Sequence, residues 1–426
     1  MTPLEDLARH RRAGRPAGIV SVCSAHPLVL RATLRHGRES GAPVLIEATC
    51  NQVNHEGGYT GMRPADFARL VRGIAAEEGC PEERIVLGGD HLGPNPWRDR
   101  PAEDAMAEAV RMVEAYAAAG FRKIHLDASM GCAGEPAALD DATTAIRAAR
   151  LARAAEGAVA ADDPRRPVYV IGTEVPPPGG ADHALDSVAV TAPEAARRTI
   201  AVHRERFAAE GLEAVLPRVI ALVVQPGVEF GNRNVVRYEP DAARDLVRLL
   251  DAEPGFVFEA HSTDYQGTAP LARLVADGFA ILKVGPELTF ALREALYALD
   301  LVASDLVSGY GDRPLMRAME ALMTGEPGHW ARHYGDGADA VWLRHYSLSD
   351  RIRYYWALPE AEAAVARLLA ALDGRRVPLP LLWQHLPGAA ALADRPFDPE
   401  AFAVAHVANR LAAYHAACGP ADRGSD

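Results

Sequence analysis

The sequence predicts a (β/α)8 barrel of about residues 15–306 that carries an α-helical C-terminal extension. Eight short apolar runs, rich in Val and Ile, alternate with longer segments of helical periodicity across this range. Such runs are typical of parallel strands that are buried on both faces. After residue 306 the helical patterns continue without a convincing strand. A doubly wound open sheet is the competing interpretation, but eight is the strand number of the barrel and no GxGxxG opens the first strand–helix unit.

Each predicted strand is a short apolar run that ends in polar residues or glycine. In chain order the runs are GIVSVC (18–23), PVLIEAT (43–49), RIVLGGD (84–90), KIHLDAS (123–129), VYVIGTE (168–174), VIALVVQ (219–225), FVFEAH (256–261) and FAILKVG (279–285). The endings carry the functional information, because the active site of such a barrel lies at the C-terminal ends of its strands.

Helices are predicted between the strands and throughout the extension. Their apolar residues recur at three- and four-residue steps, and a glycine follows several of them. The clearest helices between strands are 64–79, 102–120 and 192–211. Those of the extension are 313–325, 361–374 and 398–419. We therefore divide the chain into a barrel, residues 1–306, and a helical extension packed on it, residues 307–426.

The composition argues against several classes of protein. The chain has 426 residues, of which 49% are hydrophobic, so it can bury a large core. Its net charge of −12 argues against nucleic acid or an anionic membrane as a partner, because both attract basic surfaces. The first residues do not resemble a signal peptide, and no apolar run reaches the roughly 18 residues that span a membrane. Five scattered cysteines without a CxxC motif indicate a reducing compartment, so we expect a cytoplasmic protein.

Seven of the eight predicted strands end in side chains that could take part in chemistry. Buried polar groups cost free energy unless they are paired, so seven such endings are hard to explain by structure alone. A divalent ion such as Zn, Mn, Co or Ni could hold converging carboxylates and imidazoles together. On this interpretation His91 binds the metal and the adjacent Asp90 transfers a proton. The side chains are Glu47, Asn51, Asp90, His91, His125, Asp127, Glu174, Gln225, Glu259, His261, Asp264 and Lys283.

The motifs at these strand ends resemble those of the GatZ/KbaZ family over nearly the whole chain. They are GGDHLGP, KIHLDAS, GTEVP, VVQPGVEF, EAHSTDYQ and KVGP. The family is described as the non-catalytic subunit of class II D-tagatose-1,6-bisphosphate aldolase. Its members have also been associated with metal-dependent C4 epimerisation between fructose and tagatose. Some have been described as tagatose-6-phosphate kinases, but this sequence contains no Walker loop or kinase-type glycine-rich loop.

That family in turn resembles the catalytic class II aldolases, which are zinc barrels, and this implies roles for individual residues. The resemblance implies proton transfer by Asp90, metal binding by His91 and His261, and a Glu174 close to the metal. Gln225 stands where the aldolases have a second histidine ligand, which leaves the metal geometry open. The sequence Ser-Thr-Asp-Tyr replaces their Gly-Gly-Ser phosphate-binding loop; this removes a backbone nest and adds a carboxylate that would repel phosphate.

The resulting expected site has three groups of residues. The expected catalytic residues are Asp90, Asp127 and Glu174. The expected metal ligands are His91, Glu174, Gln225 and His261. The expected substrate-binding residues are Glu47, Asn51, Glu259, Asp264 and Lys283.

Several of these side chains allow a second interpretation. His125 shares a strand face with Asp127 and could be a core histidine held by that carboxylate, rather than part of the site. Lys283 could form a Schiff base, as in class I aldolases, but we favour a buried ion pair. Arg351 and Arg353 could clamp a phosphate or pin the extension to the barrel, and we favour the second.

The function that these residues predict is a metal-dependent reaction at C3–C4 of a ketohexose or ketohexose phosphate. We favour an aldol-type cleavage and re-formation of C3–C4 over hydride or proton removal at C4, because no nicotinamide-binding motif is present. One alternative is a non-catalytic subunit that stabilises a catalytic class II aldolase. Another is a sugar-binding or regulatory barrel without turnover. The expected partners are the ketohexose or its phosphate and, in the first alternative, the catalytic aldolase. The sequence does not decide whether the chain forms a homo-oligomer.

Overall fold

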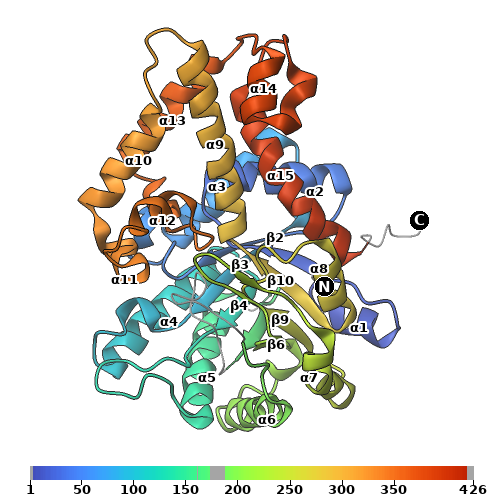
Figure 1. Cartoon of the computed structure of the whole chain (residues 1–426). Coiled ribbons are helices and arrows are strands. Elements are labelled where there is room, and N and C mark those ends of the chain that lie inside the picture. The colour runs from blue at the N-terminus through green and yellow to red at the C-terminus, as the bar shows by residue number, and fades with distance from the viewer. Residues whose placement is uncertain (1–2, 161, 173–187, 420–426) are drawn as a thin grey trace.

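A computed structural model describes residues 3–160, 162–172 and 188–419. Eight parallel strands close into a barrel in the order β1-β2-β3-β4-β5-β6-β9-β10, with β10 pairing back to β1 (Figure 1). They are β1 Ile19–Val22, β2 Val44–Thr49, β3 Ile85–Leu92, β4 Lys123–Leu126, β5 Val168–Ile171, β6 Val219–Val224, β9 Val257–Ala260 and β10 Phe279–Val284. Every one lies within or overlaps a predicted run, so the predicted (β/α)8 barrel is confirmed.

Helices follow the strands and surround the barrel (Figure 1). They are α2 Pro27–Ser40, α3 Pro64–Glu78, α4 Ala102–Ala118, α5 Asp141–Ala158, α6 Pro193–Ala209, α7 Pro240–Ala252, α8 Thr268–Ala276 and α9 Pro286–Leu306. Five of them begin with proline, whose missing N–H costs nothing in the first helical turn. The three helices predicted between strands correspond to α3, α4 and α6.

The N-terminal helix α1, Leu7–Arg12, closes one end of the barrel. Leu4, Leu7 and Ala8 are buried in one apolar cluster with inward-facing residues from the first halves of the strands, such as Ile19 and Leu45. Apolar packing therefore fills the end at which the strands begin. The buried charged groups lie at the opposite end, where the strands finish.

The extension is helical in the part of it that the structure describes, apart from one isolated β-bridge. Its helices are α10 Pro314–Gly325, α11 Ala331–Tyr334, α12 Ala340–Tyr346, α13 Pro359–Leu372, α14 Leu379–His385 and α15 Pro399–Cys418. Helix α15 returns to the barrel and packs against α2, α8 and α9 (Figure 1). Helix α9 ends at Leu306, and the division of the chain at this residue stays a prediction.

Two features were not predicted from the sequence. A short antiparallel hairpin, β7 Glu229–Phe230 and β8 Val235–Val236, follows β6. A 3-10 turn, Arg351–Tyr355, links α12 to α13 and contributes to the cavity described below. Among the described helices, none combines the length and the hydropathy needed to cross a membrane.

Candidate active site

The sequence GGDHLGP forms the end of β3 and the turn that leaves it. A Cβ atom on Gly88 would lie 2.6 Å from Cγ of Glu47, and one on Gly89 would lie 2.8 Å from the Tyr116 ring. The two glycines therefore admit a buried carboxylate on one side and an aromatic ring on the other. Pairing with β4 shifts register between Gly89 and Leu92, and His91 has a φ of 51°.

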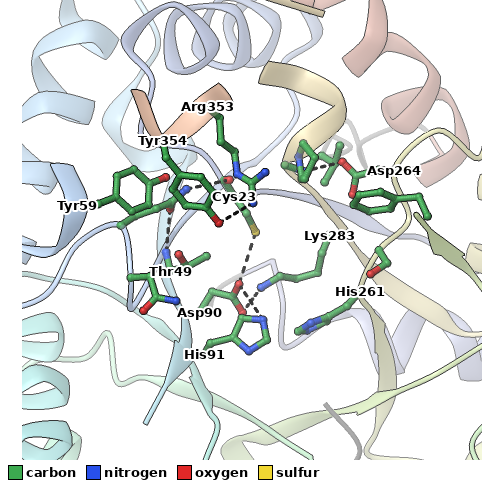
Figure 2. Close-up of a pocket in the computed structure, with 17 residues that line it drawn as sticks. Cys23, Thr49, Tyr59, Asp90, His91, His261, Asp264, Lys283, Arg353 and Tyr354 are labelled. Atoms are coloured by element: carbon green, nitrogen blue, oxygen red, sulfur yellow. Dashed lines mark hydrogen bonds and ion pairs between the residues drawn. The ribbon is translucent and has the colours of Figure 1, made fainter. Parts of the chain in front are cut away.

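This irregularity explains how neighbouring residues share one site. Successive side chains of a regular strand point to opposite faces. The bulge and the left-handed backbone of His91 re-aim the chain, so that Asp90 and His91 both line the same cavity (Figure 2). A positive φ on a non-glycine residue is unfavourable, and such strain is concentrated at functional sites.

Three imidazoles surround the centre of the barrel mouth. His91, His125 and His261 come from the ends of β3, β4 and β9. Their ring centroids are 5.1 Å apart for His91 and His125, 5.0 Å for His91 and His261, and 5.3 Å for His125 and His261. All three residues are at least 95% buried.

Each imidazole is paired with a carboxylate. Nδ1 of His91 lies 2.8 Å from Asp127, and Nδ1 of His125 lies 3.0 Å from Asp90. Nε2 of His261 lies 3.0 Å from Glu259. Of the two interpretations of His125, the one in which Asp127 holds it is therefore wrong. The bulge at the end of β3 brings the His91 ring to Asp127 and places the Asp90 carboxylate beside His125.

Two buried ammonium groups connect the carboxylates. Nζ of Lys123 lies 2.7 Å from Glu47 and 2.6 Å from Glu259. Nζ of Lys283 contacts Asp90 and lies 3.1 Å from Glu47. Sequence reasoning missed Lys123, although the alternation of β4 puts it on the same face as His125 and Asp127. The ion pairing of Lys283 agrees with the interpretation that we favoured for it.

The pKa values follow from burial and these pairs. Burial favours the neutral acid, but His91 and Lys283 outweigh it and hold the pKa of Asp90 well below its usual value. Burial likewise opposes the ammonium of Lys283, yet Asp90 and its neighbours raise its pKa well above the ordinary value. Schiff-base chemistry needs a neutral amine, so this environment argues against it. Burial lowers the pKa of His261 to about 3, which keeps this imidazole neutral and able to bind a metal.

The charge of the site suits a divalent cation. Among the described residues at its centre, four buried carboxylates face two ammonium groups, which leaves two negative charges when the imidazoles are neutral. The carboxylates are Glu47, Asp90, Asp127 and Glu259, and the ammonium groups are Lys123 and Lys283. Buried charges that lack compensation are costly. A divalent ion would balance this excess.

The donor geometry also fits a metal. One ligand atom each from Asp90, His125, Glu259 and His261 lie within 4.8 Å of one another. Nε2 of His125 is buried and has no hydrogen-bond partner among the described residues. His91 is not among these four residues, but its ring centroid lies 5.1 Å from that of His125 and 5.0 Å from that of His261.

Of the remaining expected residues, Gln225, Asn51 and Asp264 are among those that the structure describes. Oε1 of Gln225 accepts hydrogen bonds from the amides of Gly227 and Val228, so this oxygen shapes the loop after β6. Asn51 and Asp264 line the cavity. Glu174 lies outside the described residues.

The site opens into two adjoining cavities. The inner one, of about 80 Å³, is lined by Asp90, His91, His261 and Lys283 among others (Figure 2). The second, of about 430 Å³, lies between the barrel and the extension. Cys23, Gln52, Tyr59 and Arg353 line both cavities. A sugar could therefore reach from the buried charges toward the extension.

Comparisons with known proteins agree with the resemblance seen in the strand-end motifs. The model of the D-tagatose-1,6-bisphosphate aldolase subunit GatZ/KbaZ-like family matches residues 4–419. The D-tagatose 6-phosphate 4-epimerase of Agrobacterium fabrum (strain C58 / ATCC 33970) is 62% identical over 417 residues, which are 98% of each chain. A crystal structure of a probable tagatose 6 phosphate kinase from Sinorhizobium meliloti 1021 is 53% identical, with a TM-score of 0.86 over 94% of this chain and 100% of that one.

Proposed function

Because the chain belongs to the GatZ/KbaZ-like family, we propose that it is a divalent-metal-dependent 4-epimerase of a ketohexose phosphate. The substrate would be D-tagatose 6-phosphate, the compound in the name of the relative from Agrobacterium fabrum, and the product its C4 epimer, D-fructose 6-phosphate. The observation that carries the proposal is the buried ring of three imidazoles and four carboxylates at the barrel mouth. A purely structural role would leave this costly set of groups unexplained.

His91, His125 and His261 are the ligands that we propose for the metal, with Asp90 or Glu259 beside them. His91 and His261 are retained from the sequence prediction, and the geometry adds His125. We do not propose Gln225 as a ligand, because its side-chain oxygen accepts two hydrogen bonds from backbone amides of its own loop. When bound, the ion would supply Lewis-acid polarisation of the C2 carbonyl oxygen.

Asp90 is the residue that we propose to move the proton. Its neighbours hold it as a carboxylate, so it can accept the proton of the C4 hydroxyl while the C3–C4 bond breaks. The electron pair of that bond passes to C3 and the carbonyl, which gives an enediolate and an aldehyde. The aldehyde then rotates so that its opposite face is turned toward C3. The C3–C4 bond forms again with inverted configuration at C4, and Asp90 returns the proton to the C4 oxygen. The Lys283 ammonium beside Asp90 keeps that carboxylate ionised in each resting state.

The test is proton NMR of purified protein with D-tagatose 6-phosphate, before and after removal of metal with EDTA. We expect D-fructose 6-phosphate to accumulate, EDTA to stop this, and one of Zn²⁺, Mn²⁺, Co²⁺ or Ni²⁺ to restore it. Absence of the C4 epimer with every metal would refute the epimerase proposal.

The family's description as an aldolase subunit supports a second candidate function. On that proposal the isolated chain does not convert D-tagatose 6-phosphate, but it raises the activity or the thermal stability of a catalytic class II aldolase. The same NMR assay with and without an added aldolase separates the two proposals. Turnover by the isolated chain would rule out a purely accessory role.

A further inference from the structure

The usual phosphate position of a (β/α)8 barrel is filled in this protein by a side chain. Such barrels often bind phosphate at the loops after their last two strands and at a helix N-terminus there. Here Oδ1 of Asp264, from the loop after β9, accepts hydrogen bonds from the amides of Gly285 at 3.1 Å and Glu287 at 2.8 Å. These are the first amides of α9, and Asp264 is 2% exposed. A phosphate at this place would meet a buried carboxyl group and backbone donors that are already occupied.

A different cationic group faces the same cavity from the extension. Arg353 lies in the 3-10 turn Arg351–Tyr355 and lines both the inner and the outer cavity. Figure 2 shows its guanidinium above Cys23, apart from Asp264. Within the described part of the chain, no carboxylate lies within ion-pair distance of it, whereas Lys283 deeper in the cavity is already paired with three.

The neighbours of Arg353 perform the structural tasks of this turn. The Asp350 carboxylate accepts hydrogen bonds from Arg293 at 3.0 Å and Thr289 at 2.7 Å, so Asp350 pins the turn to α9. Arg351 donates to the carbonyl of His329 within the extension. We favoured the interpretation that both arginines attach the extension to the barrel, but Asp350 makes that attachment. Arg351 instead links two parts of the extension. Arg353 is the arginine of the turn that lines the cavity.

The contacts of Arg353 hold its guanidinium in place without neutralising it. It donates to the carbonyls of Ser349 and Asp350 and to the hydroxyl of Tyr354, and it lies 4.5 Å from the centroid of the Tyr354 ring. Tyr59 packs edge-on against that ring and lines both cavities as well. Burial raises the pKa of Tyr59 to about 12, so its hydroxyl stays a neutral donor. A fixed guanidinium beside phenolic hydroxyls is suited to a phosphate monoester.

We propose that Arg353 binds the phosphate group of the substrate, while Asp264 closes the phosphate position at the N-terminus of α9. This inference rests on the proposed function and specifies its substrate class. A ketohexose with a single phosphate fits, with its reacting carbons near Asp90 and its phosphate at the boundary of the two cavities. A bisphosphate would bring its second phosphate toward the negative charges of the inner site.

The experiment compares binding and turnover in wild type, Arg353→Met, Arg353→Lys and Arg332→Met. Arg332 is an exposed arginine of α11 that lines neither cavity, so its replacement is the matched control. Binding is measured by calorimetry with D-glucitol 6-phosphate, a hexitol phosphate that lacks the carbonyl and cannot react. Loss of a charge-assisted contact should weaken binding at least about tenfold in Arg353→Met, less in Arg353→Lys, and not in the control. Circular dichroism and thermal melting establish that each variant is folded.

Turnover provides the second readout. We expect Arg353→Met to raise KM for D-tagatose 6-phosphate at least about tenfold and to change kcat/KM for unphosphorylated D-tagatose less than about twofold. Equal affinity of wild type and folded Arg353→Met for D-glucitol 6-phosphate, including no binding by either, overturns the inference. A wild type that binds this compound through Arg353 but makes no C4 epimer overturns only the epimerase proposal.

Discussion

At the scale of single residues, the carboxylate partner of each imidazole decides which nitrogen is free. The pKa of Asp127 is lowered to about 2, because the hydrogen bond and charge of His91 outweigh burial, so Asp127 acts as an acceptor. Nδ1 of His91 must then donate to it, and Nε2 would offer its lone pair once it has lost its own proton, as metal binding requires. Ligand histidines are commonly oriented by such a carboxylate. Asp127, expected to be catalytic, is in this view a positioning residue.

Replacement of Asp90 by asparagine tests the proton transfer. Asp90→Asn keeps the shape of the side chain but removes the carboxylate that would accept a proton, so kcat should fall by roughly 10²–10⁴. The measurement is the initial rate of C4 epimerisation by NMR, with metal content determined on the same sample.

The same Asp-to-Asn replacement outside the site shows whether the loss of kcat is specific to Asp90. Asp140 caps α5 by accepting from the amide of Thr143, and asparagine is an equally good N-cap. Asp140→Asn should therefore leave both rate and stability unchanged. An Asp90→Asn enzyme with near wild-type kcat would eliminate Asp90 as the proton-transfer group.

At the scale of elements, α15 fastens the extension to the loops that carry the site. The hydroxyl of Tyr414 contacts the carbonyl of Thr263 at 3.0 Å and the carboxylate of Glu287 at 2.6 Å. Glu287 also accepts from the amide of Tyr265, in the loop after β9. One buried hydroxyl of the last helix thus supports the loop that presents Asp264.

Removal of that hydroxyl should destabilise the protein. Tyr414→Phe leaves the half-buried carboxylate of Glu287 without one of its donors, and we expect a loss of about 1–2 kcal/mol in the free energy of unfolding. Chemical denaturation measures it. Tyr346→Phe, at a side chain that is 42% exposed, is the control and should change stability little. Equal effects of the two replacements would show that the Tyr414 hydroxyl contributes nothing specific.

The contact between α2 and α15 should make stability depend on pH. His36 and His415 stack with ring centroids 3.8 Å apart, and Nε2 of each is buried without a hydrogen-bond partner among the described residues. Burial, with a contribution from His36, lowers the pKa of His415 from 6.5 to about 3. Between these values the unfolded chain binds a proton that the folded protein does not. The free energy of unfolding therefore falls as pH falls below 6.5.

The variant that tests this is His415→Phe, which keeps a stacked ring but cannot titrate. Each proton contributes a slope of up to about 1.4 kcal/mol per pH unit, so between pH 7 and pH 5 the variant should lose on the order of 1 kcal/mol less stability than wild type. Denaturation curves at several pH values measure the difference. His36→Phe should act in the same direction. Parallel pH profiles of wild type and His415→Phe would contradict the prediction.

At the scale of the whole molecule, the barrel and the identity of the strand-end residues could be predicted from the sequence, but their pairing could not. Alternation of apolar runs and helices is a local signal, and it located all eight strands. The bulge that turns His91 toward Asp127 depends on the register between β3 and β4. Lys123 reaches Glu47 and Glu259 only because the barrel closes. The role of Arg353 depends on the path of the extension, which no local pattern encodes.

The charge balance of the barrel mouth leads to a prediction about the stability of the whole protein. When the imidazoles are neutral, four carboxylates and two ammonium groups leave an excess of two negative charges at a site buried at the centre of the fold. A divalent ion that binds only the folded protein stabilises it by about 2.7 kcal/mol at a free concentration of 100 times its Kd. Metal-free protein should therefore melt a few degrees below protein supplied with the ion, as measured by differential scanning calorimetry.

The same measurement on His261→Ala locates the ion. This variant lacks one of the three imidazoles, so metal should raise its Tm less than it raises that of wild type, and elemental analysis should find less bound metal. His406→Ala, on the outer helix α15, is the matched control and should respond as wild type does. A Tm rise of equal size in His261→Ala would mean that the ion binds elsewhere. His55, Glu56 and Glu108 would then be the group to test, because their ligand atoms also lie within 4.8 Å of one another.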